Sequence, residues 1–279
     1  DPSGPMAEAV RVLRGNLSFT GVDGDIRSFM VTSSVRTEGK SVTSSNLAVA
    51  LALAGQRVVL LDADFRRPRI HSYMRVSNAV GLSSVLARKV DLFEALVPVS
   101  LDTLGGGDET TLRAIVREAK SVRVRSELPP GVHRAKDRQG PSELGESRSE
   151  SETDAELRVL PSGPLPPNPG EMAASHRLGE IIHELSKVSD FVILDTPPLL
   201  EVGDAAAMAA KVDGMLFVVN MGTVRWPMLE RVRAQVERFP CRKLGLVVVA
   251  AKHSRRSAYR YEYRPDRNAE DVPPMMVSE

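Results

Sequence analysis

The sequence has a single cysteine, few aromatic residues and almost no net charge. Because Cys241 is the one cysteine, an internal disulfide is excluded, and this composition is typical of a reducing compartment. The 37 basic and 36 acidic side chains give a formal net charge of +1, which does not indicate a nucleic-acid partner. No apolar run approaches the length needed to cross a bilayer, and no signal-peptide pattern opens the sequence. We therefore expect a cytoplasmic domain that binds no nucleic acid.

The rest of the composition is that of a folded domain. A hydrophobic fraction of 42% is enough for a packed core and too high for a wholly disordered chain. At 279 residues, we expect 1–279 to form one large domain with an insertion. Since the first residue is Asp1 rather than Met, we expect the chain to be a piece of a longer polypeptide. Any membrane segment then lies upstream or in a partner, and holds the domain at the inner face of the cell membrane.

Short apolar runs alternate with helical stretches along the chain. The runs that predict strands are 28–34, 56–64, 190–198, 212–220 and 244–250. Apolar residues at helical spacing predict helices at 41–55, 171–187 and 227–238. Continuous apolar runs are typical of parallel strands that are covered on both faces. The pattern predicts an α/β fold, in which a doubly wound, mostly parallel sheet carries helices on both faces.

One segment interrupts this alternation. Residues 105–153 are rich in Gly, Pro, Ser and mixed charge, and include SELGESRSESETD. A short amphipathic helix is compatible with 109–122, but little after it is apolar enough to enter a core. The composition predicts a low-complexity insertion that is disordered over 127–153. We expect this insertion to be solvated and to carry no chemistry.

The stretch SVRTEGKS (34–41) lies between the first predicted strand and the following helix. It has the spacing of a phosphate-binding loop, except that a serine replaces the opening glycine. In such a loop, backbone N–H groups and the helix N-terminus face the phosphates, the lysine reaches the outer phosphates, and the final hydroxyl ligates Mg²⁺. A chance Gly-Lys-Ser at a helix start is the alternative, but the strand–loop–helix context favours nucleotide binding and a P-loop NTPase fold. The residues predicted to contact ATP and Mg²⁺ are Ser34, Thr37, Glu38, Gly39, Lys40, Ser41 and Val42.

Three carboxylates follow predicted strands. Asp62 and Asp64 alternate with Ala63, so in an extended chain both side chains project to the same side. Asp195 ends another apolar run, and the carboxyl ends of parallel strands form the edge of an open sheet where ligands bind. Any one of these residues alone is more simply a helix cap or loop starter. Together they predict Mg²⁺ ligation, or proton abstraction from an attacking hydroxyl, beside the bound phosphates.

These motifs together resemble those of the bacterial tyrosine kinases. LLDADFRRP, ILDTPP and the Gly-Lys-Ser loop look like the paired acidic motifs and phosphate loop of that family. EAVRVLRGNLSF (8–19) resembles its N-terminal signature, and LPSGPLPPNPGEM (160–172) resembles a loop found ahead of its second acidic strand. The sequence SAYRYEYRPD (257–266) resembles its autophosphorylation cluster. The resemblance covers most of the chain apart from the insertion.

The resemblance implies a protein-tyrosine autokinase that regulates the synthesis or export of capsular or extracellular polysaccharide. In that interpretation Lys40 and Ser41 hold phosphate and metal, and Asp62 is the catalytic base. Asp64 and Asp195 position Mg²⁺ with Ser41, and Arg66 orients Asp62 or a phosphate. The implied phosphate acceptors, on a flexible tail (253–279), are Tyr259, Tyr261 and Tyr263.

The resemblance also implies two kinds of partner. Glu8, Arg11 and Arg14 are three residues apart on a predicted N-terminal helix (1–20), and in the family such a row joins subunits into a ring. Without the family resemblance, the same three residues are more simply a solvated helix face whose ion pairs stabilise the helix by a few tenths of a kcal/mol. A membrane-spanning polysaccharide co-polymerase, fused or separate, is the implied activator.

The loop departs from the family at two positions. The family has Pro-Gly where this chain has Arg36 and Thr37, and Thr37 cannot adopt a positive φ as readily as glycine. Two alternatives therefore stand beside the kinase. The first is a chromosome-partitioning or division-site ATPase, but those proteins have a signature lysine at the position of Val35 and no tyrosine tail. The second is a regulatory subunit with weakened catalysis, which the altered loop favours.

Overall fold

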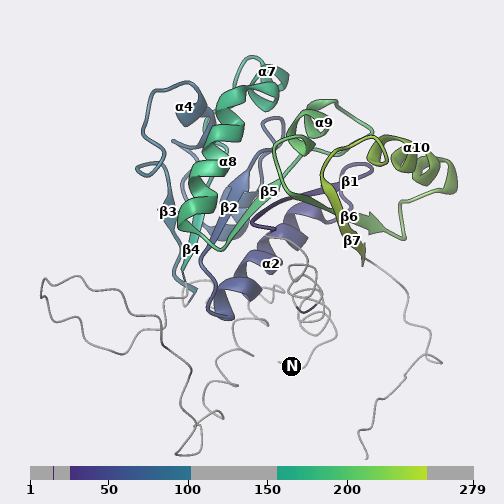
Figure 1. Cartoon of the computed structure of the whole chain (residues 1–279), viewed down its shortest axis with the longest axis horizontal. Coiled ribbons are helices and arrows are strands. Elements are labelled where there is room, and N and C mark those ends of the chain that lie inside the picture. Colours follow the sequence, from purple (N-terminus) through teal and green to yellow (C-terminus); the bar gives the residue numbers. More distant parts are fainter. Residues whose placement is uncertain (1–14, 16–25, 102–155, 250–279) are drawn as a thin grey trace, which may run out of the picture.

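The computed structural model describes Gly15, residues 26–101 and residues 156–249. Within these residues a seven-stranded sheet has the order β3-β4-β2-β5-β1-β6-β7, and every pairing is parallel except that of β3 with β4 (Figure 1). The strands are β1 (Ser28–Ser33), β2 (Val58–Asp62), β3 (Val97–Pro98), β4 (Leu157–Leu160), β5 (Phe191–Asp195), β6 (Gly214–Asn220) and β7 (Arg242–Val249). The predicted fold class, an α/β fold with a mostly parallel sheet, is confirmed.

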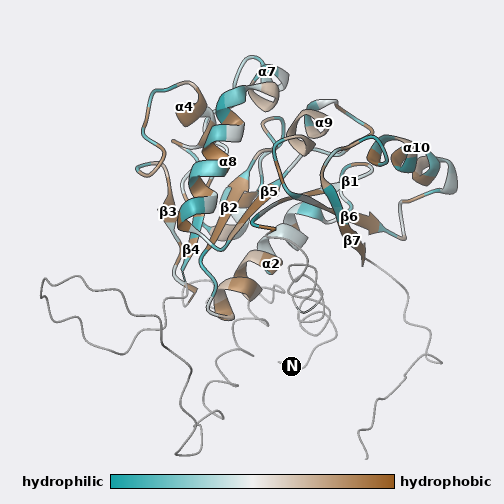
Figure 2. Cartoon of the chain, in the orientation of Figure 1, coloured by the Kyte–Doolittle hydropathy of each residue, from teal (hydrophilic) through white to brown (hydrophobic). Residues whose placement is uncertain are grey.

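Helices cover both faces of the sheet and bury a core on each. They are α2 (Lys40–Leu53), α3 (Ile70–Met74), α4 (Leu82–Leu86), α7 (Pro169–Ala174), α8 (His176–Val188), α9 (Asp204–Ala209) and α10 (Trp226–Val236). Apolar side chains of α2 and α3 pack on one face, and those of the other five helices pack on the opposite face. In Figure 2 the central strands are brown, whereas α8 alternates between brown and teal, as expected for a helix with one face on the sheet.

The five predicted strands correspond to β1, β2, β5, β6 and β7. Two strands were not predicted: β3 has two residues and β4 has four, too few for a periodicity to show. The helix predicted at 171–187 is wrong in one respect, because the structure has two helices there, α7 and α8. Ser175 separates them with extended ψ, and its hydroxyl accepts the N–H of Leu178 at 3.3 Å, which caps the start of α8.

The register of the strands brings distant residues together at one edge. Asp62 and Asp195 are the last residues of β2 and β5, and these parallel neighbours pair them directly. Val31 of β1, three residues before the phosphate-loop segment, pairs with Asp195 from the other side. The sheet therefore places the loop and the predicted acidic residues at the carboxyl ends of three adjacent strands.

Several predictions concern residues outside the described ranges. These are the N-terminal helix apart from Gly15, the insertion at 105–153 and the tail at 253–279. Among the described residues, no helix is both long enough and apolar enough to span a bilayer.

Candidate active site

The loop between β1 and α2 ends in a left-handed glycine. Gly39 has φ +92°, and α2 begins directly after it without a side-chain cap. The left-handed turn lets the chain enter α2 sharply, and the first N–H groups of a helix have no partner within the helix. The start of this 14-residue helix thus presents N–H donors and a partial positive charge, which suit a phosphate group.

Thr37 adopts the left-handed conformation that its side chain disfavours. Its φ is +62°, and its hydroxyl donates a 2.6 Å hydrogen bond to the carbonyl of Arg36. The loop therefore keeps the path that a glycine would take, and the sequence departure is absorbed as backbone strain of about 1 kcal/mol or more.

The Thr37→Gly variant is expected to be more stable than the parent by up to about 1 kcal/mol, because glycine relieves this strain. For a protein of this size the melting temperature rises by roughly 2–4 °C. The matched control is Thr43→Gly within α2, which is expected to lower the melting temperature, because glycine weakens a helix interior. A decrease for both variants would contradict the inferred strain.

Glu38 stabilises the phosphate loop through hydrogen bonds on its buried side. Its side chain is fully buried, and one carboxylate oxygen accepts the Ser34 hydroxyl at 2.5 Å and the Val35 N–H at 2.9 Å. The other oxygen accepts the N–H of Asn220, at the end of β6, at 3.4 Å. These contacts hold the shape of the loop. Neither Ser34 nor Glu38 lines the cavity described below, although both were predicted to contact nucleotide.

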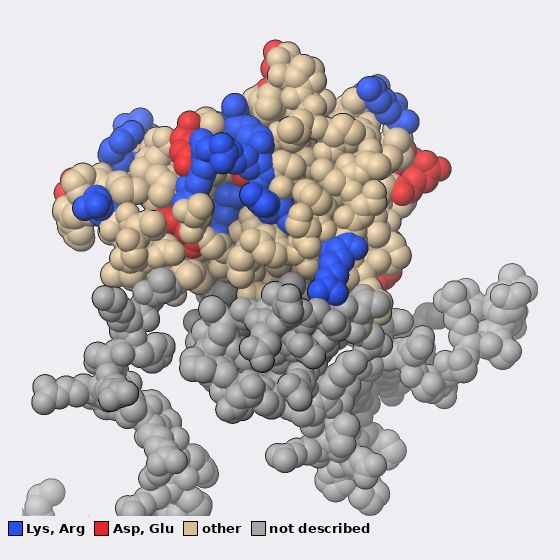
Figure 3. All heavy atoms as spheres, turned by 180° about the vertical axis from the view of Figure 1, so that it is seen from behind, with Lys and Arg blue, Asp and Glu red and all other residues tan. Residues whose placement is uncertain are grey.

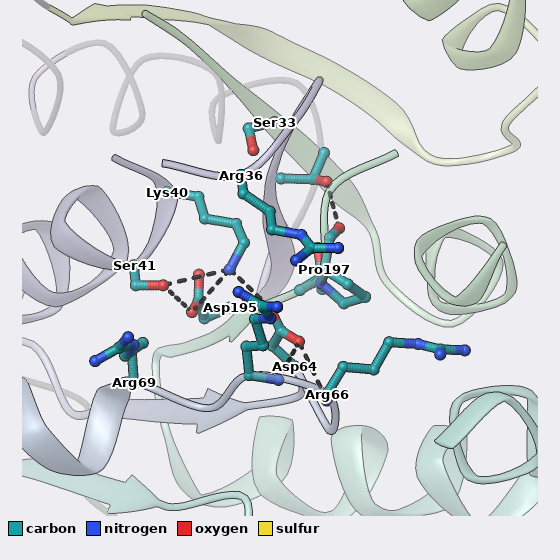
Figure 4. Close-up of polar contacts among 12 residues, drawn as sticks. Ser33, Arg36, Lys40, Ser41, Asp64, Arg66, Arg69, Asp195 and Pro197 are labelled. Atoms are coloured by element: carbon teal, nitrogen blue, oxygen red, sulfur yellow. Dashed lines mark hydrogen bonds and ion pairs between the residues drawn. The ribbon is translucent and has the colours of Figure 1, made fainter. Parts of the chain in front are cut away.

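Lys40 lies between two of the predicted carboxylates. Its Nζ is 2.9 Å from Asp64 Oδ2 and 3.7 Å from Asp195 Oδ2 (Figure 4). The pKa of Lys40 is raised: burial acts to lower it, but the nearby carboxylates, Asp195 first and then Asp64, outweigh that effect. The ammonium group is therefore charged and points to the place where the three strands end.

Asp195 is held by two hydroxyls of α2. Ser41 Oγ donates to its Oδ2 at 2.6 Å, and Ser44 Oγ donates to its Oδ1 at 3.2 Å. Burial raises the pKa of Asp195, while Lys40 and Ser41 oppose that rise. A hydroxyl bonded to a carboxylate beside a free helix N-terminus fits Mg²⁺, which prefers oxygen ligands and usually shares them between protein and phosphates.

Asp62 caps the start of a helix and has a strongly raised pKa. One carboxylate oxygen accepts the N–H groups of Arg69 and Ile70 at 2.9 Å each, at the start of α3. Burial, followed by repulsion from Asp195, raises the pKa of Asp62 to about 8. At neutral pH the group is therefore mostly protonated when the site holds no ligand. Its carboxyl is fully buried and does not line the cavity, whereas that of Asp64 does.

Two ion pairs tie the segment after β5 to the site. The guanidinium of Arg36 pairs with Glu201, and that of Arg66 pairs with Asp204 at 2.8 Å. The N–H groups of Leu199 and Leu200 donate to the carbonyls of Ser33 and Ser34 at 2.8 and 3.0 Å.

Arg66 was predicted to orient Asp62 or a phosphate. In the structure its guanidinium binds Asp204, the first residue of α9.

An open cavity of about 550 Å³ joins these elements. Its lining comes from the phosphate loop, the segment after β2, and the segment after β5, and includes Lys40, Ser41, Asp64, Arg66, Pro197 and Glu201. Within 26–101 and 156–249 no group of three or more His, Cys, Asp or Glu side chains is arranged to hold a metal ion.

The structure thus brings together the predicted residues Lys40, Ser41, Asp62, Asp64 and Asp195. The predicted Tyr259, Tyr261, Tyr263, Glu8, Arg11 and Arg14 lie outside the described residues. Ser44, Glu201 and Asp204 belong to the site but were not predicted to. Ser44 is one helical turn after Ser41, so the helical spacing could have placed it on the same side of α2. Glu201 and Asp204, the partners of Arg36 and Arg66, could not be found from the sequence, because these contacts depend on how distant segments pack.

Comparisons with known proteins point to one family, although no protein-family model matches the chain. It is 29% identical over 261 residues to the tyrosine-protein kinase YwqD of Bacillus subtilis, covering 94% of this chain and 88% of YwqD. It is 27% identical to the tyrosine-protein kinase CpsD of Streptococcus agalactiae, covering 86% and 82%. Against the tyrosine-protein kinase Etk of Escherichia coli the identity is 28%, covering 80% of this chain and 23% of Etk.

Solved structures agree with these relatives. The kinase domain of Escherichia coli tyrosine kinase ETK has a TM-score of 0.68 at 25% identity, covering 95% of this chain and 83% of that domain. The chimerical protein CapA2B2 has a TM-score of 0.65 at 26% identity, covering 89% and 86%. The cell division ATPase MinD of Pyrococcus furiosus has a TM-score of 0.54 at 19% identity, covering 82% and 74%, which shows a shared fold only.

Proposed function

Because the chain belongs to the bacterial tyrosine kinases, we propose that it transfers the γ-phosphoryl group of ATP to tyrosine hydroxyls, including those of Tyr259, Tyr261 and Tyr263. The observation that supports this most strongly is the meeting of Lys40 with Asp62, Asp64 and Asp195 at one edge of the sheet. This edge also carries the start of α2, so phosphate-binding and proton-accepting groups share one site.

The phosphate loop would bind the triphosphate. N–H groups at the start of α2 hydrogen-bond phosphate oxygens, and Lys40 exchanges Asp64 for an outer phosphate. Ser41, Asp64 and Asp195 are the residues proposed to hold Mg²⁺, which would neutralise charge on the phosphates. Since Ser41 and Asp195 already contact each other at 2.6 Å, little movement is needed to form this part of the site.

Asp62 is the proposed base for the acceptor tyrosine. A tyrosine hydroxyl has a pKa of about 10 and is a poor nucleophile until it loses its proton. Its oxygen attacks the γ-phosphorus, the bond from that phosphorus to the β–γ bridging oxygen breaks, ADP leaves, and the hydroxyl proton passes to Asp62. A pKa of about 8 suits this role, because a general base works best when its pKa lies near the working pH.

The partners follow from the family as proposals. Glu8, Arg11 and Arg14 would join copies of the chain in a ring, so that the tail of one subunit reaches the site of another. A transmembrane polysaccharide co-polymerase, fused or separate, would activate the kinase and hold it at the inner face of the membrane. The chain spans 88% of YwqD but 23% of Etk, so the matched kinases include both short and long chains. The process regulated would be the synthesis or export of capsular or extracellular polysaccharide.

The rival function is a nucleotide switch without kinase activity, which the fold shared with MinD allows. The test is incubation of the purified chain with ATP and Mg²⁺, followed by detection of phosphotyrosine and of released phosphate. We expect phosphotyrosine on the parent chain and its loss when Tyr259, Tyr261 and Tyr263 are all replaced by Phe. Trp226→Phe, at the exposed start of α10 and away from the cavity, is the matched single control and is expected to keep the tail signal. Phosphate release without any phosphotyrosine would favour the switch and overturn the proposal.

A further inference from the structure

The cavity is bordered by four arginines that differ in their partners. Arg36 and Arg66 are already paired, with Glu201 and Asp204. Arg67 and Arg69 also line the cavity and are exposed, and among the described residues neither side chain makes an ion pair or hydrogen bond. Figure 4 shows Arg69 on the Ser41 side of the cluster and Arg66 on the far side of Asp64. Within residues 26–101 and 156–249, two of the four guanidinium groups therefore have no side-chain partner and can bind an anion.

The backbone of this pair is fixed by the acidic residues of the site. The N–H of Arg67 donates to Asp64 at 3.0 Å, and the N–H of Arg69 donates to Asp62 at 2.9 Å. Pro68 lies between them and restricts the chain further. The two side chains therefore extend from a rigid base that is bonded directly to the proposed base and metal ligand.

The surroundings favour a negatively charged ligand. Figure 3 shows Lys and Arg side chains gathered near the middle of one face, with acidic side chains at the margin of the group. Tyr73, 38% exposed, adds an aromatic ring and a hydroxyl to the lining beside Arg69. A guanidinium binds a carboxylate through two parallel N–H···O bonds, so two free guanidinium groups at the entrance suit an acidic peptide.

We propose that Arg67 and Arg69 form an acidic-residue subsite, which binds Asp or Glu side chains next to the acceptor tyrosine and so selects the tyrosines that are phosphorylated. This inference rests on the proposed kinase function and names its substrate class. The remaining cation that lines the cavity is Lys40, which contacts Asp64 and Asp195. In the proposed function Lys40 binds an outer phosphate of ATP and is not available to the acceptor peptide. Recognition of the acceptor would thus fall to Arg67 and Arg69, whose side chains have no partner in the described part of the chain.

The tail of the chain gives a specific consequence. Glu262 lies directly between Tyr261 and Tyr263, whereas Tyr259 is flanked by Ala258 and Arg260. We expect Tyr261 and Tyr263 to be phosphorylated before Tyr259, since the subsite can hold the Glu262 carboxylate while either neighbour is in place.

The test uses two peptides of residues 257–266 in which Tyr261 is the single tyrosine, the other two being replaced by Phe. One keeps Glu262 and the other carries Glu262→Gln. For the parent chain, kcat/KM is expected to be about tenfold higher for the peptide with Glu262, which is what two partly exposed ion pairs contribute. In the Arg67→Gln/Arg69→Gln variant this ratio is expected to fall close to one. Arg231→Gln, on an exposed part of α10 away from the cavity, is the matched control and keeps the ratio.

Each outcome decides the inference. Equal kcat/KM for the two peptides with the parent chain, or an unchanged ratio in the double variant, would overturn the subsite but leave the kinase function intact. A higher KM for ATP with an unchanged peptide ratio would assign the arginines to the nucleotide instead. If no peptide and no tail tyrosine is phosphorylated, the proposed function fails and the subsite fails with it. Melting temperatures of all variants show whether each one is folded.

Discussion

The Lys40→Met variant is expected to phosphorylate tyrosine at least about 100- to 1,000-fold more slowly than the parent chain. Lys40 is the cation proposed to meet the outer phosphates, and removal of one group that stabilises developing charge costs this much in other enzymes. The rate is measured with saturating ATP and Mg²⁺ by phosphotyrosine formation on a peptide. Lys187→Met, on the exposed end of α8, is the matched control and keeps the parental rate.

Loss of Lys40 also removes the counter-charge of buried carboxylates. The side chains of Asp64 and Asp195 are 5% and 0% exposed, so without Lys40 both lose a buried ionic partner, and the pKa of Asp195 is expected to rise further. The Lys40→Arg variant separates this effect from catalysis. Arginine keeps the positive charge but cannot present the same compact ammonium group. Compared with Lys40→Met, the Lys40→Arg variant is therefore expected to have a melting temperature closer to that of the parent, but no higher rate of phosphorylation. A fully active Lys40→Met variant would contradict the role of this residue.

The Asp62→Asn variant is expected to lower kcat by about 100- to 10,000-fold, the usual range for loss of a general base. The amide oxygen can still accept the N–H groups of Arg69 and Ile70, so the start of α3 keeps its cap. In the parent, kcat/KM is expected to rise with pH as Asp62 loses its proton, with a midpoint near its pKa of about 8. The variant is expected to lack this rise.

The same group makes stability depend on pH. The pKa of Asp62 is higher in the folded protein than its ordinary value of 3.8, so the folded state holds the proton more tightly. Protonation of Asp62 therefore stabilises the fold at low pH, and this stability is lost as the pH rises through about 8. The melting temperature of the ligand-free parent is expected to fall as the pH rises from about 4 to about 8, and less so in Asp62→Asn. If Asp64→Asn rather than Asp62→Asn abolishes the rise of kcat/KM, the base is Asp64.

Much of the architecture was predictable because parallel strands covered on both faces leave long apolar runs. The apolar runs that end at Asp62 and Asp195 could be recognised as strands without knowing which strands pair with them. The rule that ligands bind at the carboxyl ends of parallel strands then located the site. The short strands β3 and β4 and the break at Ser175 were missed, since a few residues carry too little periodic signal.

The contacts within the site were less predictable, because they depend on packing between distant segments. The sequence indicated that Arg66 lies near the phosphates, but its partner Asp204 is 138 residues away. Glu38 was expected to face nucleotide, yet the loop turns it inward to bond Ser34 and Val35. Thr37 was expected to resist a positive φ, and the fold imposes one all the same. In each case tertiary contacts outweigh the local preference of a single residue.

The central claim is that Lys40, Asp62, Asp64 and Asp195 surround one magnesium-bound triphosphate. A crystal structure with Mg²⁺ and a non-hydrolysable ATP analogue tests it most directly. We expect the metal about 2.0–2.1 Å from Ser41 Oγ, and Lys40 Nζ moved from Asp64 to a phosphate oxygen. A triphosphate bound elsewhere, or a Lys40 that stays on its carboxylates while the nucleotide is in place, would contradict the account.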